Sequence, residues 1–227
     1  MFKKKRKELR RKLVTSTDPR SIVSEQFRMI RENIKFSMKD KQLNTLLFTS
    51  AAKGEGKSTI AANTAIAFAQ EGKKVLLVDA DLRKPTIHHT FNKLLSPGFT
   101  NLLMIQWKIQ DVVKESGIKG LDLITCGPIP SNPAELLGSN SMDGFIREAR
   151  DKYDIVIFDA PPVLSVADAQ ILSEKCDGTI LVISSGTTEK RFAIKAKEVL
   201  QASKANMVGT VLNNFKLEKN HYYYQYY

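Results

Sequence analysis

A glycine-rich segment, Ser50-Ala51-Ala52-Lys53-Gly54-Glu55-Gly56-Lys57-Ser58-Thr59, constrains the fold of this chain more than any other part of its 227 residues. It follows an apolar run at 46–49 and precedes an alanine-rich segment of helical composition at 57–70. Its core, Gly-x-Gly-Lys-Ser-Thr, is typical of a loop whose backbone N–H groups surround phosphate oxygens, where a Cβ atom would clash. A helix that begins there directs its positive end at the same anion. The segment therefore predicts a nucleotide-binding site.

The residues of this loop have different predicted roles. Lys57 is expected to neutralise the β- and γ-phosphates, and the Ser58 hydroxyl to bind Mg²⁺. The standard pattern has a glycine five positions before Gly56, where this chain has Ala51. The residues expected to contact the nucleotide are Lys53, Gly54, Glu55, Gly56, Lys57, Ser58 and Thr59 of this loop, together with Arg83 and Asn213 from later in the chain.

Short apolar runs alternate with longer segments of helical pattern after residue 44. Runs that are apolar on both faces, separated by helices, indicate a parallel sheet covered on both sides. We expect strands at 46–49, 75–78, 121–125, 155–158, 180–183 and 207–212, and helices at 24–38, 57–70, 142–152, 166–175 and 190–202. Residues 83–120 are less regular, and we expect a surface excursion there. The predicted fold class is α/β: a P-loop nucleotide-binding fold with a predominantly parallel sheet and helices on both faces.

Acidic residues follow two of the predicted strands. Asp79 and Asp81 come directly after the run at 75–78 and precede Arg83, and Asp159 ends the run at 155–158. In open α/β sheets ligands bind outside the carboxyl ends of the strands, so these acids should share an edge with the glycine-rich loop. Three carboxylates facing a triphosphate require a cation, and Mg²⁺ meets that need. Asn213 follows the last strand at the same edge; its amide could hydrogen-bond adenine or simply end the strand.

Positive charge is concentrated at the start of the chain. Residues 1–12 contain eight Lys or Arg and one Glu, which is +7 of the total net charge of +11. Such an arm can bind anionic lipid, nucleic acid or an acidic partner, or remain solvated, and we do not expect nucleic acid to be the partner.

The predicted organisation is a basic arm at 1–16, a nucleotide-binding domain at 17–215 and a tail at 216–227. Two cysteines and no apolar run of about 18 residues predict a cytoplasmic chain without a membrane span.

A predicted helix near the start of the domain has a patterned charged face. Asp18 and Pro19 are expected to begin it as cap and first-turn residues. Glu25, Arg28 and Arg31 follow at three-residue spacing on one face. Two interpretations are open for this face: an intrahelical ladder of ion pairs, or a surface on which another subunit docks.

These motifs together resemble the bacterial tyrosine kinases of capsule and exopolysaccharide synthesis. Members of that family have a Walker A loop, a second motif of the form apolar run-Asp-x-Asp-x-Arg, and a Walker B Asp; here these are 54–59, 75–83 and 155–159. They also have a Glu-x-x-Arg-x-x-Arg helix, matched by Glu25, Arg28 and Arg31. They end in a cluster of tyrosines, and this chain ends in Tyr222, Tyr223, Tyr224, Tyr226 and Tyr227.

The resemblance implies an activity and partners. It implies an ATP- and Mg²⁺-dependent protein-tyrosine kinase that phosphorylates its own terminal tyrosines, in trans within a homo-oligomeric ring such as an octamer. Asp79 is the expected base, and Ser58, Asp81 and Asp159 the expected metal-binding residues. The resemblance further implies a transmembrane activator of polysaccharide export, other protein substrates and a tyrosine phosphatase. The chain is then expected to lie at the inner face of the membrane through its activator.

The same fold serves the Min and Par partitioning ATPases. A non-kinase ATPase switch of that type is therefore the alternative to the kinase function. Those proteins have a lysine five positions before the Walker lysine, where this chain has Ala52. Lys53 stands one position later, where the kinases often have proline. This departure argues against a partitioning ATPase and leaves the role of Lys53 open.

Overall fold

The computed structural model describes residues 13–39, 42–105 and 107–215. Within these residues, seven strands form one sheet in the order β3-β4-β2-β5-β1-β6-β7. All neighbouring strands are parallel except the edge pair β3 and β4, which is antiparallel. The strands are β1 Thr45–Ser50, β2 Val75–Asp79, β3 Lys114–Ile118, β4 Leu121–Ile124, β5 Ile155–Asp159, β6 Gly178–Ser184 and β7 Met207–Asn213.

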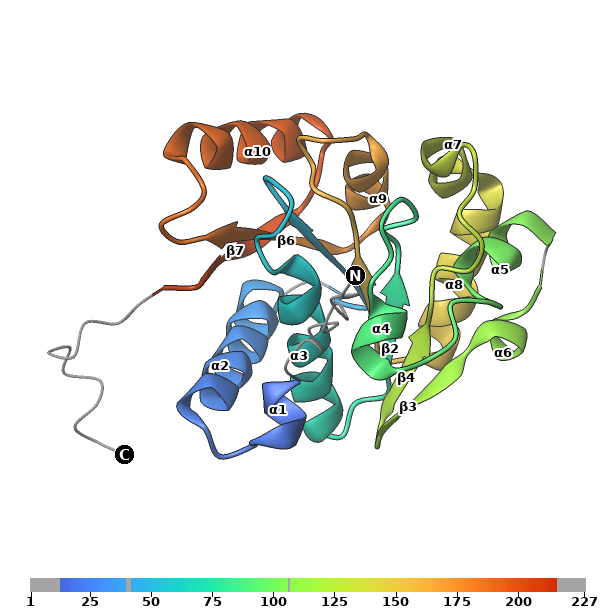
Figure 1. Cartoon of the computed structure of the whole chain (residues 1–227), viewed down its shortest axis with the longest axis horizontal. Coiled ribbons are helices and arrows are strands. Elements are labelled where there is room, and N and C mark those ends of the chain that lie inside the picture. Colours follow the sequence, from blue (N-terminus) through green and yellow to red (C-terminus); the bar gives the residue numbers. More distant parts are fainter. Residues whose placement is uncertain (1–12, 40–41, 106, 216–227) are drawn as a thin grey trace, which may run out of the picture.

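Helices cover both faces of the sheet because the central strands are apolar on both sides (Figure 1). Leu46 and Phe48 of β1 face one core, and Leu47 faces the other. The first core is covered by α1 Val14–Thr17, α2 Ile22–Ser37, α3 Lys57–Gln70 and α4 Ile87–Phe91. The second is covered by α5 Phe99–Ile105, α6 Ile109–Val112, α7 Pro133–Gly138, α8 Asn140–Lys152, α9 Asp168–Lys175 and α10 Lys190–Ala202. The predicted fold class and all six predicted strands are confirmed.

The start of α2 differs from the prediction. Its N-cap is Ser21, whose hydroxyl accepts the N–H of Ser24, so the predicted cap at Asp18 is wrong. Asp18 instead ends the short helix α1, and its carbonyl accepts the hydroxyls of Ser21 and Ser24. A serine hydroxyl at the N-cap, just before the first helical residue, accepts a backbone N–H that has no partner within the helix.

Ordered structure begins before the predicted domain boundary at residue 17. Thr15 of α1 is buried, and both its N–H and its hydroxyl donate to the side-chain oxygen of Asn63 in α3, at 3.0 and 2.9 Å. Residues 13–16, which were expected to belong to the basic arm, therefore belong to the folded domain. Residues 1–12 of that arm lie outside the described residues.

The region 83–120 is more than a surface excursion. It forms α4, α5, α6 and the edge strand β3. Phe99 of α5 is fully buried, with its ring 4.9 Å from that of Phe145 and 6.4 Å from that of Phe158. Part of the second core is therefore built from this region. Among the described residues, none of the helices combines the length and apolar composition needed to cross a membrane.

Candidate active site

The glycine-rich loop and the predicted acids meet at one edge of the sheet. The loop follows β1, Asp79 ends β2 and Asp159 ends β5. Asp159 lies beside Phe48 of β1 in the strand register and beside Asp79 of β2. Neighbouring strands are about 4.8 Å apart, so parallel strands that end together bring these carboxylates close to the loop.

Lys57 lies between two carboxylates. Its Nζ is 3.0 Å from Oδ2 of Asp81 and 3.1 Å from Oδ1 of Asp159, and its side chain is 12% exposed. Burial lowers the pKa of this amine, but the negative charges of Asp159 and Asp81 outweigh burial, so the pKa is raised overall. A fixed cation at the start of α3 is therefore ready to receive phosphate oxygens.

Asp79 is buried and titrates in an unusual range. Its Oδ2 accepts the N–H groups of Thr86 and Ile87, both at 2.9 Å, which holds the carboxyl against the start of α4. Burial, followed by the charge of Asp159, raises the pKa of Asp79 to about 7, against the opposing effects of Lys57 and the two N–H groups. Its Oδ1 has no hydrogen-bond partner. A carboxyl with a pKa near neutrality and an oxygen without a partner can accept a proton, although this oxygen is buried and Asp79 does not line the nucleotide cavity.

The acidic edge also fits Mg²⁺. Oδ2 of Asp159 is buried without a hydrogen-bond partner, and the Ser58 hydroxyl is buried at the same edge. The described residues contain no group of three or more His, Cys, Asp or Glu placed to hold a metal. Proteins usually bind Mg²⁺ through one or two carboxylates together with substrate phosphates and water, so such a group is not required. The residues present therefore suit Mg²⁺ that arrives with a nucleotide.

A cavity of about 540 Å³ opens beside these groups. Most of the predicted nucleotide-binding residues line it, namely Lys53, Gly54, Gly56, Lys57, Ser58, Thr59 and Arg83, and so does Asp81, which was predicted to bind the metal. Sequence reasoning missed the other lining residues, which are Lys84, Thr86, Pro161, Pro162, Ser165 and Val166. The Thr86 hydroxyl lies 3.4 Å from that of Ser58. The only feature of the sequence that could have indicated a role for Thr86 in this cavity is its position shortly after the Asp-x-Asp-x-Arg segment.

Three predicted ligand-binding residues are engaged with other parts of the protein. The Glu55 carboxylate is buried and accepts the Ala52 N–H and the Thr188 hydroxyl, so it braces the loop. Asn213 donates its amide to the Glu55 carbonyl at 2.9 Å. Arg83 forms a two-pronged ion pair with Asp168 at the start of α9, at 2.9 and 3.0 Å. The predicted contact between Asn213 and adenine stays a prediction.

Comparisons with known proteins assign this chain to a family. Residues 44–203 match a family described as an AAA domain. The tyrosine-protein kinase YwqD of Bacillus subtilis (strain 168) is 52% identical over 219 residues, which cover 96% of this chain and 92% of that protein. This chain belongs to the bacterial tyrosine-protein kinases.

Several solved structures have the same architecture as this chain. The chimerical protein CapA2B2 is 41% identical, with a TM-score of 0.87 over 90% of each chain. The kinase domain of Escherichia coli tyrosine kinase ETK is 30% identical, with a TM-score of 0.88 over 92% of this chain and 82% of that one. The septum site-determining protein MinD from Pyrococcus horikoshii, 21% identical with a TM-score of 0.66 over 78% and 72% of the two chains, shares the fold.

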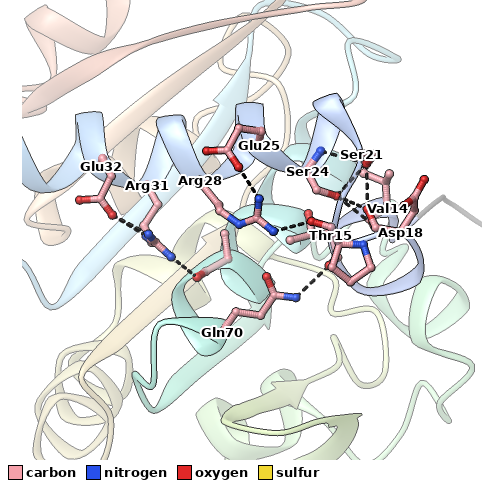
Figure 2. A network of polar contacts seen from close by, with 12 residues as sticks. Val14, Thr15, Asp18, Ser21, Ser24, Glu25, Arg28, Arg31, Glu32 and Gln70 are labelled. Carbon is pink, nitrogen blue, oxygen red and sulfur yellow. Dashed lines mark hydrogen bonds and ion pairs between the residues drawn. The ribbon is translucent and has the colours of Figure 1, made fainter. Parts of the chain in front are cut away.

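The charged residues of α2 in this tyrosine kinase do not form one ladder (Figure 2). The Arg28 guanidinium pairs with Glu25 and donates to the Pro19 carbonyl, with its side chain 32% exposed. Arg31 pairs with Glu32, the next residue of α2, at 2.6 Å, and it also donates to the Ala67 carbonyl of α3 at 2.9 Å, with its side chain only 14% exposed. The structure thus shows intrahelical ion pairs for both arginines and an additional interhelical contact for Arg31. The terminal tyrosines lie outside the described residues.

Proposed function

We propose that this chain is an ATP-dependent protein-tyrosine kinase that phosphorylates its own terminal tyrosines and acts in capsule or exopolysaccharide biosynthesis. The observation that carries this proposal is the placement of Lys57 between Asp81 and Asp159, on a glycine-rich loop beside a cavity large enough for a nucleotide. Relatives named as tyrosine kinases, and Ala52 where partitioning ATPases have lysine, favour a kinase over a partitioning switch.

The reaction needs positioning and charge neutralisation more than covalent catalysis. A tyrosine oxygen attacks the γ-phosphorus, the bond to the bridging oxygen of ADP breaks, and the phenolic proton leaves. Lys57 stabilises the negative charge on the transferred group, and the Asp79 carboxyl, whose pKa of about 7 suits a base at neutral pH, is the proposed proton acceptor. Ser58, Asp81 and Asp159 would hold Mg²⁺, which supplies further positive charge at the phosphates.

The tail is long enough to bring tyrosines to a nucleotide site. It follows β7, whose end Asn213 lies at the active-site edge. Thirteen residues follow Asn214, up to Tyr227, and a random-coil peptide of that length has an end-to-end distance of about 20 Å and a maximum reach of about 43 Å. Tethering at this length corresponds to roughly millimolar effective concentration. Such a tail could enter the site of its own chain or of a neighbour, and the family resemblance favours the neighbour.

Mass spectrometry of the C-terminal peptide tests the proposed activity. After incubation of the full chain with Mg²⁺ and ATP, we expect the peptide to gain about 80 mass units for each phosphate transferred. A variant with all five terminal tyrosines replaced by phenylalanine should lose this gain, because only the acceptor oxygens are removed. ATP turnover without any phosphotyrosine, even with a cytoplasmic fragment of an activator added, would contradict the kinase proposal. The alternative function, a non-kinase ATPase switch, would then remain.

We also propose that the exposed charged part of α2 joins subunits into a ring. Arg28 is the better residue to test, because removal of the more buried Arg31 would also weaken the packing of α2 on α3. Arg28→Ala should lower both the mass of the oligomer in light scattering and the rate of tail phosphorylation in dilute solution. Arg147→Ala, at an exposed position of α8, is the matched control. An unchanged mass for Arg28→Ala would exclude this surface as the ring contact.

The remaining partners follow from the family. We propose a transmembrane activator that brings the chain to the inner face of the membrane, further protein substrates, and a tyrosine phosphatase that restores the unmodified tail.

A further inference from the structure

A second cavity, of about 310 Å³, adjoins the nucleotide cavity. Its walls come from the glycine-rich loop, from the segment before α9 and from α10, which lies on the same face of the sheet as α9 (Figure 1). Lys53 and Ser165 line both cavities. A ligand in the second cavity therefore lies next to whatever occupies the first.

The second cavity combines positive charge with an aromatic surface. Lys53 comes from the loop and Lys195 from α10, and no ion pair joins either lysine to an acid within the described residues. The cavity lining contains no acidic residue. Phe192 of α10 also lines it, although the ring is 41% exposed, and Arg191 stacks 4.9 Å from the ring centroid. Two cations beside an aromatic ring suit a ligand that is both anionic and aromatic.

We infer that this second cavity binds a phosphotyrosine of the terminal cluster while the nucleotide cavity receives the next tyrosine. This inference rests on the proposed kinase function. The unmodified tail has one acidic side chain, Glu218, beside Lys216 and Lys219, and none of its aromatic rings carries a charge, so it lacks an anionic aromatic group for the two lysines. Each phosphate adds about −1.5 to −2 charge to an aromatic ring. The product of the first transfer, and not the original tail, therefore has the chemistry that the cavity recognises.

The spacing of the tyrosines agrees with occupation of two adjacent sites. In an extended peptide, residues two positions apart point to the same side and are about 7 Å apart. The pairs Tyr222 with Tyr224 and Tyr224 with Tyr226 have this spacing. A tail bound in an extended conformation could thus place a phosphotyrosine near Lys195 and an unmodified tyrosine at the nucleotide. The first transfer should then be slow and later transfers faster.

A time course of phosphate number per chain tests this order. Lys195→Gln should gain the first phosphate at the wild-type rate but gain the second about fivefold more slowly, which is the loss expected for one partly exposed charge contact. Phe192→Ala, which removes the aromatic surface, should also slow the second transfer and leave the first unchanged. Lys197→Gln, also exposed on α10 but outside the cavity, is the matched control and should follow the wild type. Equal slowing of every step, or no slowing of any step, would overturn the inference. Dilution shows whether the tail that is phosphorylated belongs to the same chain or to a neighbour. Transfer to a neighbour slows with dilution, whereas transfer within one chain does not.

A binding experiment separates this inference from the kinase function. The chain with five phenylalanines would be titrated, without nucleotide, with a peptide of residues 216–227 phosphorylated at Tyr224, with the unmodified peptide, and with inorganic phosphate. We expect the phosphopeptide to bind more tightly than both, and Lys195→Gln to weaken its binding about fivefold. Equal affinity for inorganic phosphate and the phosphopeptide would overturn the inference. Failure of the kinase function would instead appear as a wild-type chain that never gains its first phosphate.

Discussion

Lys57→Met is expected to lower the rate of phosphate transfer to tyrosine by about two to three orders of magnitude, the effect typical of removing one charge-stabilising group from an active site. The methionine side chain has a similar length but no charge, so the transferred phosphoryl group loses its fixed cation. The measurement is phosphotyrosine formed per minute with Mg²⁺ and ATP in excess. Lys119→Met, at an exposed turn between β3 and β4, is the matched control.

The same substitution should also destabilise the protein without nucleotide. Asp81 and Asp159 would lose the ammonium group that neutralises them, and Asp159 is fully buried. Removing one partner of a buried ion pair costs about 3 kcal/mol of unfolding free energy. Lys57→Arg keeps the positive charge and should retain most of the stability while still losing activity. Transfer within tenfold of wild type in folded Lys57→Met would contradict the role assigned to Lys57.

Gly98→Ala is expected to lower the free energy of unfolding by about 3 kcal/mol, at the upper end of the usual cost of overpacking. A Cβ atom at this position would lie 2.3 Å from the Gly127 nitrogen and 2.3 Å from the Thr125 carbonyl oxygen. These are backbone atoms, so no side-chain rotation can make room. The N–H of Phe99 donates to the same Thr125 carbonyl at 2.7 Å. Moving Gly98 away would break this bond and withdraw the Phe99 ring from the second core.

Urea unfolding measures this effect, and a second glycine provides the control. Gly144 lies inside α8, where an added Cβ atom would meet only the Arg147 guanidinium, at 3.9 Å. Gly144→Ala should stabilise the protein by up to about 1 kcal/mol, because alanine loses less backbone entropy than glycine in a helix. A loss of less than 1 kcal/mol in Gly98→Ala would mean that the segment before α5 adapts to the added atom.

Local patterns predicted the elements that carry the nucleotide site. The runs at 75–78 and 155–158 are apolar on both faces and end in aspartates, which is typical of buried parallel strands with ligand-binding ends. The structure places Asp79 beside Asp159, as that pattern indicates. The region 83–120 lacked such a pattern, because α5 is short and its role depends on burial of Phe99 against α8 and β5.

The direction in which a side chain points could not be read from spacing. Arg28 and Arg31 are three residues apart and each pairs with a glutamate of α2, yet only Arg31 also reaches a carbonyl of α3. Likewise Glu55 belongs to the glycine-rich loop but turns its carboxylate to Ala52 and Thr188, away from the nucleotide cavity. The orientation of each side chain depends on which hydrogen-bond partner from a distant segment lies close enough to it.

The sequence by itself determined that a glycine-rich loop and two acidic strand ends would meet at one edge of a parallel sheet, because strand ends and loop chemistry are local properties of the chain. Only the tertiary structure decided that Lys57 lies between Asp81 and Asp159, and that burial and the neighbouring Asp159 raise the pKa of Asp79 to about 7. Only the tertiary structure brought Lys53 and Lys195 to the walls of one cavity. Distances between residues far apart in the chain, and the burial that strengthens their charges, arise when separate elements pack together.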